Sequence, residues 1–288
     1  MSPSRTIHRC LVQAAITLQH TSETSRLDAE VLLAAVLQRD RTYLYAYSET
    51  LVAEAIAQVF FQHVARRQRG EPIAHITGSR EFWSLPISVN NSTLIPRPDT
   101  ELLVETALHL CDKENARVLD LGTGTGAIAL ALAKEKDTWQ IDAVDKQADA
   151  VQLAQHNADV FALCNVRIYE SDWFIAVPDS QCFDVVISNP PYIAADDKHL
   201  LQGDVRFEPR SALVAADEGY ADLFFIVRTA KTFLCDAGLL LLEHGYAQGE
   251  KLRAYLQQCG YSNIHTVCDY SGNERVTHAV WRVGGKNG

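Results

Sequence analysis

Four consecutive residues, Asn189-Pro190-Pro191-Tyr192, carry the most specific chemistry of the chain. They follow the apolar run Val185–Ile187, which reads as a buried strand, and the prolines end it because they lack an N–H and fix φ. The Asn189 side chain and the Pro190 carbonyl each offer an acceptor oxygen. Two acceptors that converge on one –NH2 group fix both of its hydrogens, and the ring of Tyr192 gives a planar group a face to stack on. The motif therefore predicts a site for a planar NH2-bearing group.

The reaction that suits this motif is methyl transfer from a sulfonium. An amide or aniline-like nitrogen is a poor nucleophile because its lone pair is delocalised, so a protein helps by positioning it and polarising that lone pair. The leaving group is a neutral thioether and needs no acid, and the proton can leave later through the Asn189 oxygen or water. A turn without chemical meaning is the alternative, because Asn-Pro is a common turn dipeptide.

A glycine-rich turn precedes this motif in the chain. Val118–Ile128 reads as a strand, the turn Gly122-Thr123-Gly124-Thr125-Gly126 and the start of a helix. Glycines let the backbone approach a ligand closely, and Asp145 follows at the distance expected for an acid that meets ribose hydroxyls. The spacing also satisfies a relaxed dinucleotide fingerprint, although Asp120 before the glycines favours the methyltransferase version. The turn predicts a nucleotide-type ligand.

The elements that would position these residues alternate between strand and helix from residue 117 onward. This alternation predicts an α/β domain with a mainly parallel sheet that is covered on both faces. No helix separates the last two predicted strands, so they form an antiparallel hairpin at the sheet edge. Ligands of such sheets bind beyond the carboxyl ends of the strands, where the strand order reverses. The predicted strands are Arg117–Leu121, Gln140–Val144, Val166–Glu170, Phe183–Ser188, Gly238–Glu243, Asn263–Val267 and Val276–Val283.

The chain before this domain has a different pattern. Residues 5–75 read as helices, with a capping box formed by Ser25 and Asp28 and a helix from about Leu51 to Arg69. Residues 81–96 read as a β-hairpin that turns at Asn90-Asn91. We therefore predict a helical domain over 1–78, a hairpin linker over 79–98 and an α/β domain over 99–288.

Composition narrows the classes of partner. The net charge is −10, and this lowers the expectation of a nucleic-acid partner, because phosphate contacts need a basic face. No apolar run is long enough to span a membrane. The seven cysteines form no C-x-x-C pair, so we expect them all to be reduced in a cytoplasmic protein. The ten histidines show no ligand spacing, and no metal is expected.

Further motifs make the chain resemble a known family, the bacterial PrmC/HemK protein-glutamine methyltransferases that modify peptide-chain release factors. The resemblance runs from about Ser25 to Arg282. Asn189–Tyr192 alone is shared with adenine and cytosine amino-methyltransferases, so the assignment depends on the other stretches. These are Arg26–Glu30, Gly70–Gly78, Leu94–Glu101 and Leu242–Gly245, of which Pro72–Gly78 and Pro96–Glu101 are the most specific.

The resemblance implies a Rossmann-like, seven-stranded class I methyltransferase domain and a small N-terminal helical bundle, joined by a β-hairpin. The bundle would dock the release factor, and the substrate would be the Gln of its Gly-Gly-Gln motif. The cofactor would be S-adenosylmethionine. The remaining roles it implies are cofactor binding by Gly122, Thr123, Gly124, Thr125, Gly126, Asp145, Trp173 and Asn189, substrate binding by Asn189, Pro190, Pro191 and Tyr192, and catalysis by Asn189 and Tyr192.

Several questions stay open at this level. A nucleic-acid amino-methyltransferase that uses the same Asn-Pro-Pro-Tyr motif is the main alternative, and a non-catalytic cofactor-binding protein is another. Asp120 could lie near the sulfonium or only brace the glycine turn, and Arg97 could orient the cofactor or the hairpin. Phe207–Arg210 could cover the site or form a surface turn. We expect a monomer that contacts neither nucleic acid nor membrane.

Overall fold

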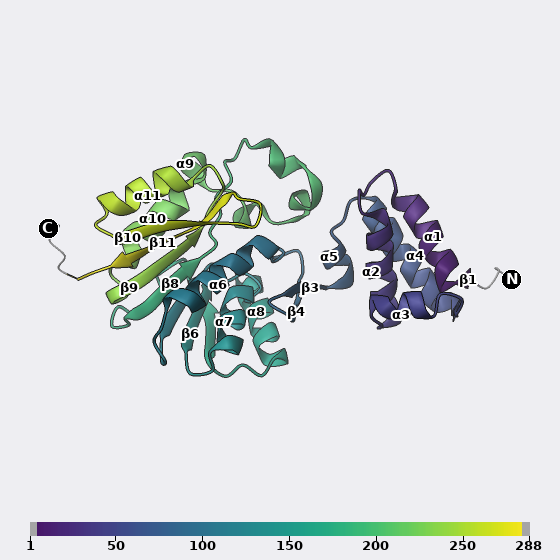
Figure 1. The fold of residues 1–288 in the computed structure, drawn as a ribbon, viewed down its shortest axis with the longest axis horizontal. Coiled ribbons are helices and arrows are strands. Elements are labelled where there is room, and N and C mark those ends of the chain that lie inside the picture. The colour runs from purple at the N-terminus through teal and green to yellow at the C-terminus, as the bar shows by residue number, and fades with distance from the viewer. Residues whose placement is uncertain (1–4, 284–288) are drawn as a thin grey trace. The chain divides into compact units, whose positions relative to one another are not determined.

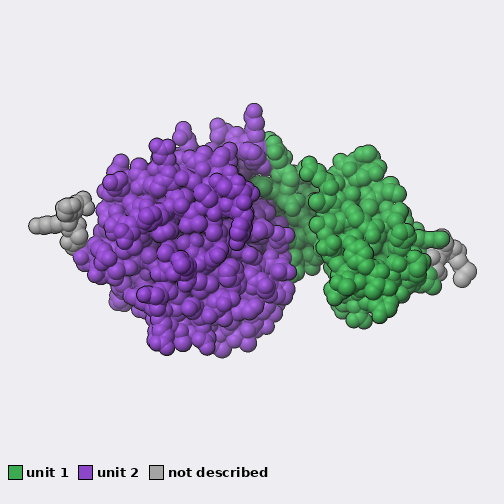
Figure 2. Space-filling model, in the orientation of Figure 1, with its two compact units in different colours: residues 1–79, 201–207 green, residues 80–200, 208–288 purple. Residues whose placement is uncertain are grey.

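The computed structural model describes residues 5–283 and divides them into two compact units (Figure 1, Figure 2). One unit holds the chain up to Ser79 together with the later segment Leu201–Phe207. The other unit holds Arg80–Leu200 and the chain from Glu208 onward. Among the described residues, no helix is both long enough and apolar enough to cross a membrane.

The first unit is a small helical bundle around its own apolar core. Its largest fully buried side chains include Leu11, Leu32 and Phe60, one from each of three helices. Two short strands pair antiparallel beside the helices, and this pairing makes the third long helix begin at Glu54 rather than near Leu51. The elements are β1 (Arg5–Thr6), α1 (Ile7–Leu18), α2 (Ser25–Leu37), α3 (Arg41–Ala46), β2 (Leu51–Val52), α4 (Glu54–Gln68) and α5 (Ile73–Thr77).

The predicted capping box at the start of α2 is wrong. Thr24 is the N-cap residue, and its side chain makes no capping hydrogen bond. Asp28 is buried instead, and it accepts hydrogen bonds from the Thr24 hydroxyl at 3.0 Å and from Arg67 Nε at 2.7 Å. Arg67 Nη1 also donates to Asp204 at 3.2 Å, which ties the segment Leu201–Phe207 to the bundle. Asp28 therefore pairs with Arg67 of another helix and does not form the predicted capping box with Ser25.

The β-hairpin is present, but its turn lies seven residues earlier than the predicted Asn90. Strands β3 (Ser79–Phe82) and β4 (Leu85–Ser88) are joined by Trp83 and Ser84, with φ of 52° and 57°. Two successive residues with positive φ give the tight turn whose twist matches the flanking strands. Asn90 instead accepts a hydrogen bond from the Ser92 N–H at 2.9 Å, after the strand has ended.

The second unit contains a seven-stranded sheet, and all seven strands predicted in the sequence are present. The order is β10-β11-β9-β8-β5-β6-β7, and β11 runs antiparallel to both of its neighbours. The other pairings are parallel. The strands are β5 (Arg117–Leu121), β6 (Gln140–Asp145), β7 (Val166–Glu170), β8 (Phe183–Ser188), β9 (Leu234–Glu243), β10 (Ser262–Cys268) and β11 (Glu274–Trp281).

Helices cover both faces of this sheet, as the alternating pattern predicts (Figure 1). Helices α6 (Glu101–Leu110), α7 (Ala127–Glu135) and α8 (Ala148–Val160) pack against one another on one face. Helices α10 (Ala221–Ala230) and α11 (Gly249–Gln258) lie on the other. The strand order reverses between β5 and β8, so the glycine turn after β5 and the Asn-Pro-Pro-Tyr motif after β8 leave the sheet side by side.

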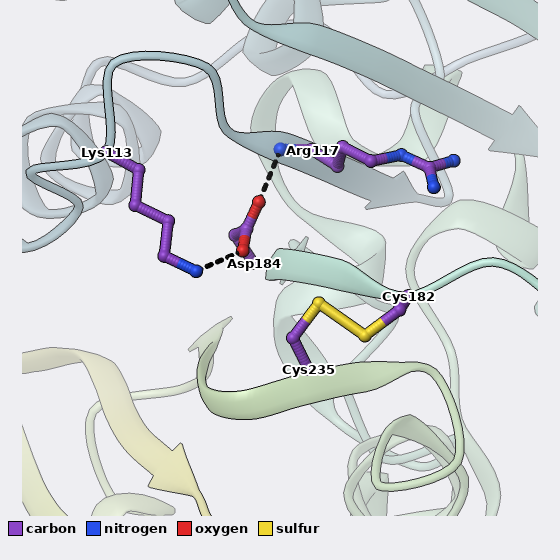
Figure 3. The surroundings of a disulfide bond; sticks show 5 residues. All are labelled: Lys113, Arg117, Cys182, Asp184 and Cys235. Atoms are coloured by element: carbon purple, nitrogen blue, oxygen red, sulfur yellow. Dashed lines mark hydrogen bonds and ion pairs between the residues drawn. A yellow bond between two sulfur atoms is a disulfide. The ribbon is translucent and has the colours of Figure 1, made fainter.

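The expectation that every cysteine is reduced is wrong. Cys182 and Cys235 form a disulfide with a Cα–Cα distance of 5.2 Å (Figure 3). Cys182 precedes β8, and Cys235 lies near the start of its parallel neighbour β9. The strand pairing brings the two residues together, and a separation of 53 positions along the chain conceals this from a search for close cysteine spacings. The disulfide lies at the amino ends of these strands, opposite the carboxyl ends.

Candidate active site

A cavity of about 310 Å³ lies in the second unit, where β5, β6 and β8 end. Eight of the residues predicted for the site line it: Gly122, Thr123, Gly124, Thr125, Asp145, Trp173, Asn189 and Pro191. Three others do not. Gly126 is the N-cap residue of α7, Pro190 is buried, and the hydroxyl of Tyr192 points to another partner.

The glycine turn has the conformation that its sequence predicts. Gly122 and Gly124 have φ of 69° and 56°, in the left-handed region that favours glycine. The Thr123 hydroxyl donates a hydrogen bond to Asp120 Oδ2 at 2.6 Å. Asp120 is fully buried and does not line the cavity, so it braces the turn from below. Burial raises the pKa of Asp120 to about 7.

Asp145 closes the turn from the end of β6. One carboxylate oxygen accepts a hydrogen bond from the Gly124 N–H at 2.9 Å, and the other accepts one from the Gln147 N–H at 2.9 Å. Each carboxylate oxygen has a second lone pair, so both keep acceptor capacity, and Asp145 lines the cavity. Burial raises the pKa of Asp145, while these two backbone donors hold it down.

Trp173 lines the cavity next to the glycine turn. Its φ is 54°, an unfavourable conformation for a bulky residue that costs on the order of 1–3 kcal/mol. A methyl group added at Gly122 would lie 3.5 Å from the Trp173 ring, so the indole packs directly over the turn. The Trp173 carbonyl also accepts the Ser171 hydroxyl at 2.7 Å, which holds the strained backbone in place.

Asn189 lines the cavity with a fixed side chain. Its Nδ2 donates a hydrogen bond to Thr100 Oγ1 at 3.2 Å. Thr100 ends the 3-10 helix η1 (Pro98–Thr100), and its side chain also lines the cavity. The preceding residue, Ser188, donates to the Leu121 carbonyl at 2.7 Å and so anchors the end of β8 to β5. Hydrogen bonds to Thr100 and to Leu121 therefore hold Asn189 and the residue before it.

Tyr192 contacts a buried carboxylate. Its hydroxyl donates to Glu243 Oε1 at 3.3 Å, and Glu243, at the end of β9, is 1% exposed. Burial raises the pKa of Glu243 to about 7, while the nearby Thr100 hydroxyl and the Arg275 guanidinium lower it. Burial, together with the charge of Glu243, raises the pKa of Tyr192 well above its ordinary value. Tyr192 is therefore a neutral hydrogen-bond donor at physiological pH.

Arg97 and Glu208 form an ion pair beside the cavity. Arg97 Nη2 lies 2.6 Å from Glu208 Oε2, and the Glu208 side chain is fully buried. Glu208 Oε1 also accepts a hydrogen bond from the Ile95 N–H at 3.4 Å. Arg97 lines the cavity, as do Ser211 and Ala212 downstream of Glu208. None of the residues Phe207–Arg210 lines the cavity, and Glu208 reaches it only through Arg97.

Sequence reasoning missed the roles of Thr100, Glu243 and Glu208. All three lie in stretches that we singled out as motifs or as a possible cover, yet none was recognised as a contact of Asn189, Tyr192 or Arg97. Their partners are 51 to 111 positions away along the chain. Residues 5–283 contain no group of His, Cys, Asp and Glu side chains that could hold a metal ion.

Solved structures share this fold at low sequence identity. A methyltransferase from Pyrococcus furiosus superposes with a TM-score of 0.54 at 18% identity, over 77% of this chain and 99% of that one. A 16S rRNA N2 G1207 methyltransferase from T. thermophilus superposes with a TM-score of 0.52 at 20% identity, over 71% of this chain and 50% of that one. Residues 98–205 match the methyltransferase small domain. The fold and the site define an S-adenosylmethionine-dependent class I methyltransferase.

Two further comparisons identify the family. Residues 9–78 match the PrmC N-terminal domain. Release factor glutamine methyltransferases are 55% identical in Shewanella oneidensis, over 98% of each chain, and 52% identical in Escherichia coli, over 92% of this chain and 96% of that one. The relative of the same name in Vibrio cholerae is 48% identical over 97% of this chain and 98% of that one. The chain belongs to the family of release factor glutamine methyltransferases.

Proposed function

We propose that this protein transfers a methyl group from S-adenosylmethionine to the side-chain amide nitrogen of the Gln in the Gly-Gly-Gln motif of peptide-chain release factors. The observation that carries the proposal is identity of 48–55% to release factor glutamine methyltransferases over nearly the whole chain. The site supplies the matching chemistry, an asparagine side chain that faces a cavity with its amide nitrogen already bonded elsewhere.

The cavity residues fit S-adenosylmethionine. The volume of the cavity is about 310 Å³, at the lower end of the range for small-molecule sites. The glycine turn lets the backbone approach a ligand closely, and Asp145 retains lone pairs that suit ribose hydroxyls. Trp173 presents a large flat surface that suits an adenine ring. When bound, the cofactor supplies an electrophilic methyl group on a sulfonium sulfur.

Asn189 and Pro190 would position the glutamine amide. The Asn189 nitrogen donates to Thr100, so its Oδ1 is the atom left for the substrate –NH2. With the Pro190 carbonyl as second acceptor, both amide hydrogens are fixed and the nitrogen lone pair is aimed at the methyl group. Positioning of this kind replaces a chance encounter by a fixed geometry, and its contribution to rate can be several kcal/mol. The Tyr192 ring would offer the planar amide a surface.

The proton balance of the reaction needs no acid in the site. The bound cofactor would supply the methyl group to the amide nitrogen, and because its sulfur–carbon bond would break to leave a neutral thioether, no residue would have to donate a proton. The methylated nitrogen then loses one proton to the Asn189 oxygen or to water. Asp120 and Glu243 are both buried away from the cavity, so neither acts as the base in this scheme.

The helical unit would dock the release factor. Residues 9–78 match the PrmC N-terminal domain, and a substrate protein needs a contact surface larger than one side chain. We assign docking to residues 1–78, the linker role to 79–98 and methyl transfer to 99–288. We also propose that the protein acts as a monomer in the cytoplasm, without a nucleic-acid or membrane partner, and its net charge of −10 supports the absence of a nucleic-acid partner.

The test is methyl transfer from radiolabelled S-adenosylmethionine to a purified bacterial release factor. A factor with Gly-Gly-Ala in place of Gly-Gly-Gln and a DNA sample are the matched controls. We expect label on the unaltered factor alone. Label on DNA would favour an amino-methyltransferase that acts on bases, and label on the Gly-Gly-Ala factor would contradict the assigned residue.

A further inference from the structure

A line of polar side chains runs from the cavity into the interior of the second unit. Asn189 faces the cavity and bonds to Thr100, Thr100 faces Glu243, and Glu243 accepts the hydroxyl of Tyr192. The four residues come from η1, from the end of β9 and from the loop after β8. We propose that Thr100 and Glu243 are positioning residues that hold the Asn189 amide with its oxygen toward the substrate nitrogen. This inference rests on the proposed function.

The orientation of the Asn189 amide decides whether the site can accept its substrate. A primary amide has an oxygen that accepts and a nitrogen that donates, and its two ends are nearly equal in size. With the oxygen toward the substrate, Asn189 accepts a hydrogen bond from the substrate –NH2. With the amide turned over, two –NH2 groups would face each other, and a buried donor would be left without a partner at a cost of about 1–3 kcal/mol. Something must therefore favour one orientation.

Thr100 cannot impose that choice alone, because a hydroxyl can donate or accept. An ionised carboxylate can only accept. If the Thr100 proton points to Glu243, then Thr100 Oγ1 can only accept from Asn189, which fixes the Asn189 nitrogen inward and its oxygen outward. The charge of Glu243 thus orients the Thr100 hydroxyl, and the Thr100 hydroxyl orients the Asn189 amide.

The surroundings of Glu243 match this role. Its Oε1 is occupied by the Tyr192 hydroxyl at 3.3 Å. Its Oε2 is buried and makes no hydrogen bond of ordinary geometry within residues 5–283, so it is available to the Thr100 hydroxyl, which already favours the ionised form of Glu243. With one oxygen on Tyr192 and the other on Thr100, the Glu243 carboxylate would hold Tyr192 directly and Asn189 through Thr100.

The charges that face Glu243 come from two other elements. Arg275 on β11 favours the ionised form, and Asp99 in η1 opposes it. Arg275 lies 3.1 Å from Asp269 and 3.7 Å from Asp99, so its charge is shared among three carboxylates. Protonation of Glu243 would add a donor where Thr100 needs an acceptor. Methyl transfer should then weaken toward acid pH, around the pKa of about 7 that burial gives Glu243.

The test compares Thr100→Val, which keeps the shape and removes the hydroxyl, with Thr100→Ser, which keeps the hydroxyl. With a release factor as substrate, we expect Thr100→Val to lower kcat by about 10–100-fold and Thr100→Ser by less than about 3-fold. The cofactor dissociation constant, measured by calorimetry, should change less than about 3-fold in both variants. Glu243→Gln should lose the acid-side fall in kcat that the unaltered protein shows.

Equal losses in the two Thr100 variants would contradict the inference, because they would mean that packing rather than the hydroxyl matters. A kcat of Thr100→Val close to that of the unaltered protein would also overturn it. A second readout does not depend on turnover. The side-chain NH2 resonance of Asn189, assigned by its loss in Asn189→Ala, should exchange with solvent faster in Thr100→Val than in Thr100→Ser. Absence of methyl transfer by the unaltered protein would contradict the proposed function, and the exchange rates would still decide the role of Thr100.

Discussion

Arg97 Nη2 donates a hydrogen bond to Glu208 Oε2 over 2.6 Å and thereby joins two segments that are 111 positions apart. Arg97 belongs to the extended stretch before η1, and Glu208 belongs to the loop that follows the Asn-Pro-Pro-Tyr motif. The Glu208 side chain is fully buried, whereas that of Arg97 is 31% exposed at the cavity. The pair therefore joins a cation at the cavity to the loop that follows the Asn-Pro-Pro-Tyr motif.

Removal of the Glu208 carboxylate should destabilise the second unit. Glu208→Ala leaves the Arg97 charge and the Ile95 N–H without this acceptor, and breaking such a pair costs about 3–5 kcal/mol when both charges are buried. Since Arg97 is partly exposed, we expect a loss of about 2–4 kcal/mol in urea unfolding. Lys113→Met is the control, because the Lys113 side chain is 53% exposed and its pair with Asp184 should contribute less than about 1 kcal/mol (Figure 3). Equal losses in the two variants would refute the structural role of Glu208.

Periodicity and glycine spacing predict the second unit well. The strands β5, β6 and β8 are largely buried apolar runs, and helices follow β5 and β6, so the positions and parallel pairing of these strands follow from local signals. The glycine turn and Asn189 also follow from local spacing, because each lies directly after a strand. These features place the two motifs at the carboxyl ends of the strands without knowledge of any side-chain contact.

The errors arise where distant residues decide the local structure. Asp28 resembles a capping residue, yet Arg67 in another helix takes its carboxylate. The hairpin turn falls at Trp83 although Asn90 is the better turn former by type, because the strand partners set its position. Thr100 and Glu243 give no local sign of their contacts, since their partners are far away along the chain. Local patterns therefore predict the elements, and the contacts between elements depend on the folded chain.

Loss of the Asp145 carboxylate should weaken cofactor binding. Charge-assisted hydrogen bonds to ribose hydroxyls contribute roughly 1.5–3 kcal/mol, so Asp145→Ala should raise the cofactor dissociation constant by about 10–100-fold in calorimetry. Asp149→Ala is the control, because it removes the same charge from an exposed position on α8. An unchanged dissociation constant in Asp145→Ala would rule out the assigned contact.

A methyl group at Gly219 should disturb the Asn-Pro-Pro-Tyr loop. Gly219 has φ of 88°, and an added Cβ would lie 2.2 Å from the Tyr192 carbonyl oxygen, a backbone atom with little freedom to move. Gly272 has φ of 84° and open space around the same position. Gly272→Ala should cost about 1–2 kcal/mol in unfolding free energy, from backbone strain alone. Gly219→Ala should cost about 1–3 kcal/mol more and lower kcat at least about 10-fold. Equal stability and activity of the two variants would show that the contact with Tyr192 is tolerant.

The buried Asp120 should make stability depend on pH. Burial raises its folded-state pKa from 3.8 to about 7, so the folded protein binds a proton that the unfolded chain has released between these values. The stabilising contribution of Asp120 is complete below pH 4 and is lost as pH rises through 7. Asp120→Asn removes this contribution. In urea unfolding, the unaltered protein should therefore lose more stability between pH 5 and pH 8 than Asp120→Asn, by over about 1 kcal/mol. The same pH dependence in both proteins would mean that Asp120 is ionised throughout this range.

The most direct test of the account is mass spectrometry of a release factor after reaction with S-adenosylmethionine and either the unaltered protein or Asn189→Ala. The account predicts one added methyl group, on the peptide with the Gly-Gly-Gln motif and on its glutamine side chain, and at least about 100-fold slower modification by Asn189→Ala. A methyl group on another residue, or near-normal modification by Asn189→Ala, would contradict the claim that this asparagine holds the glutamine amide for methylation.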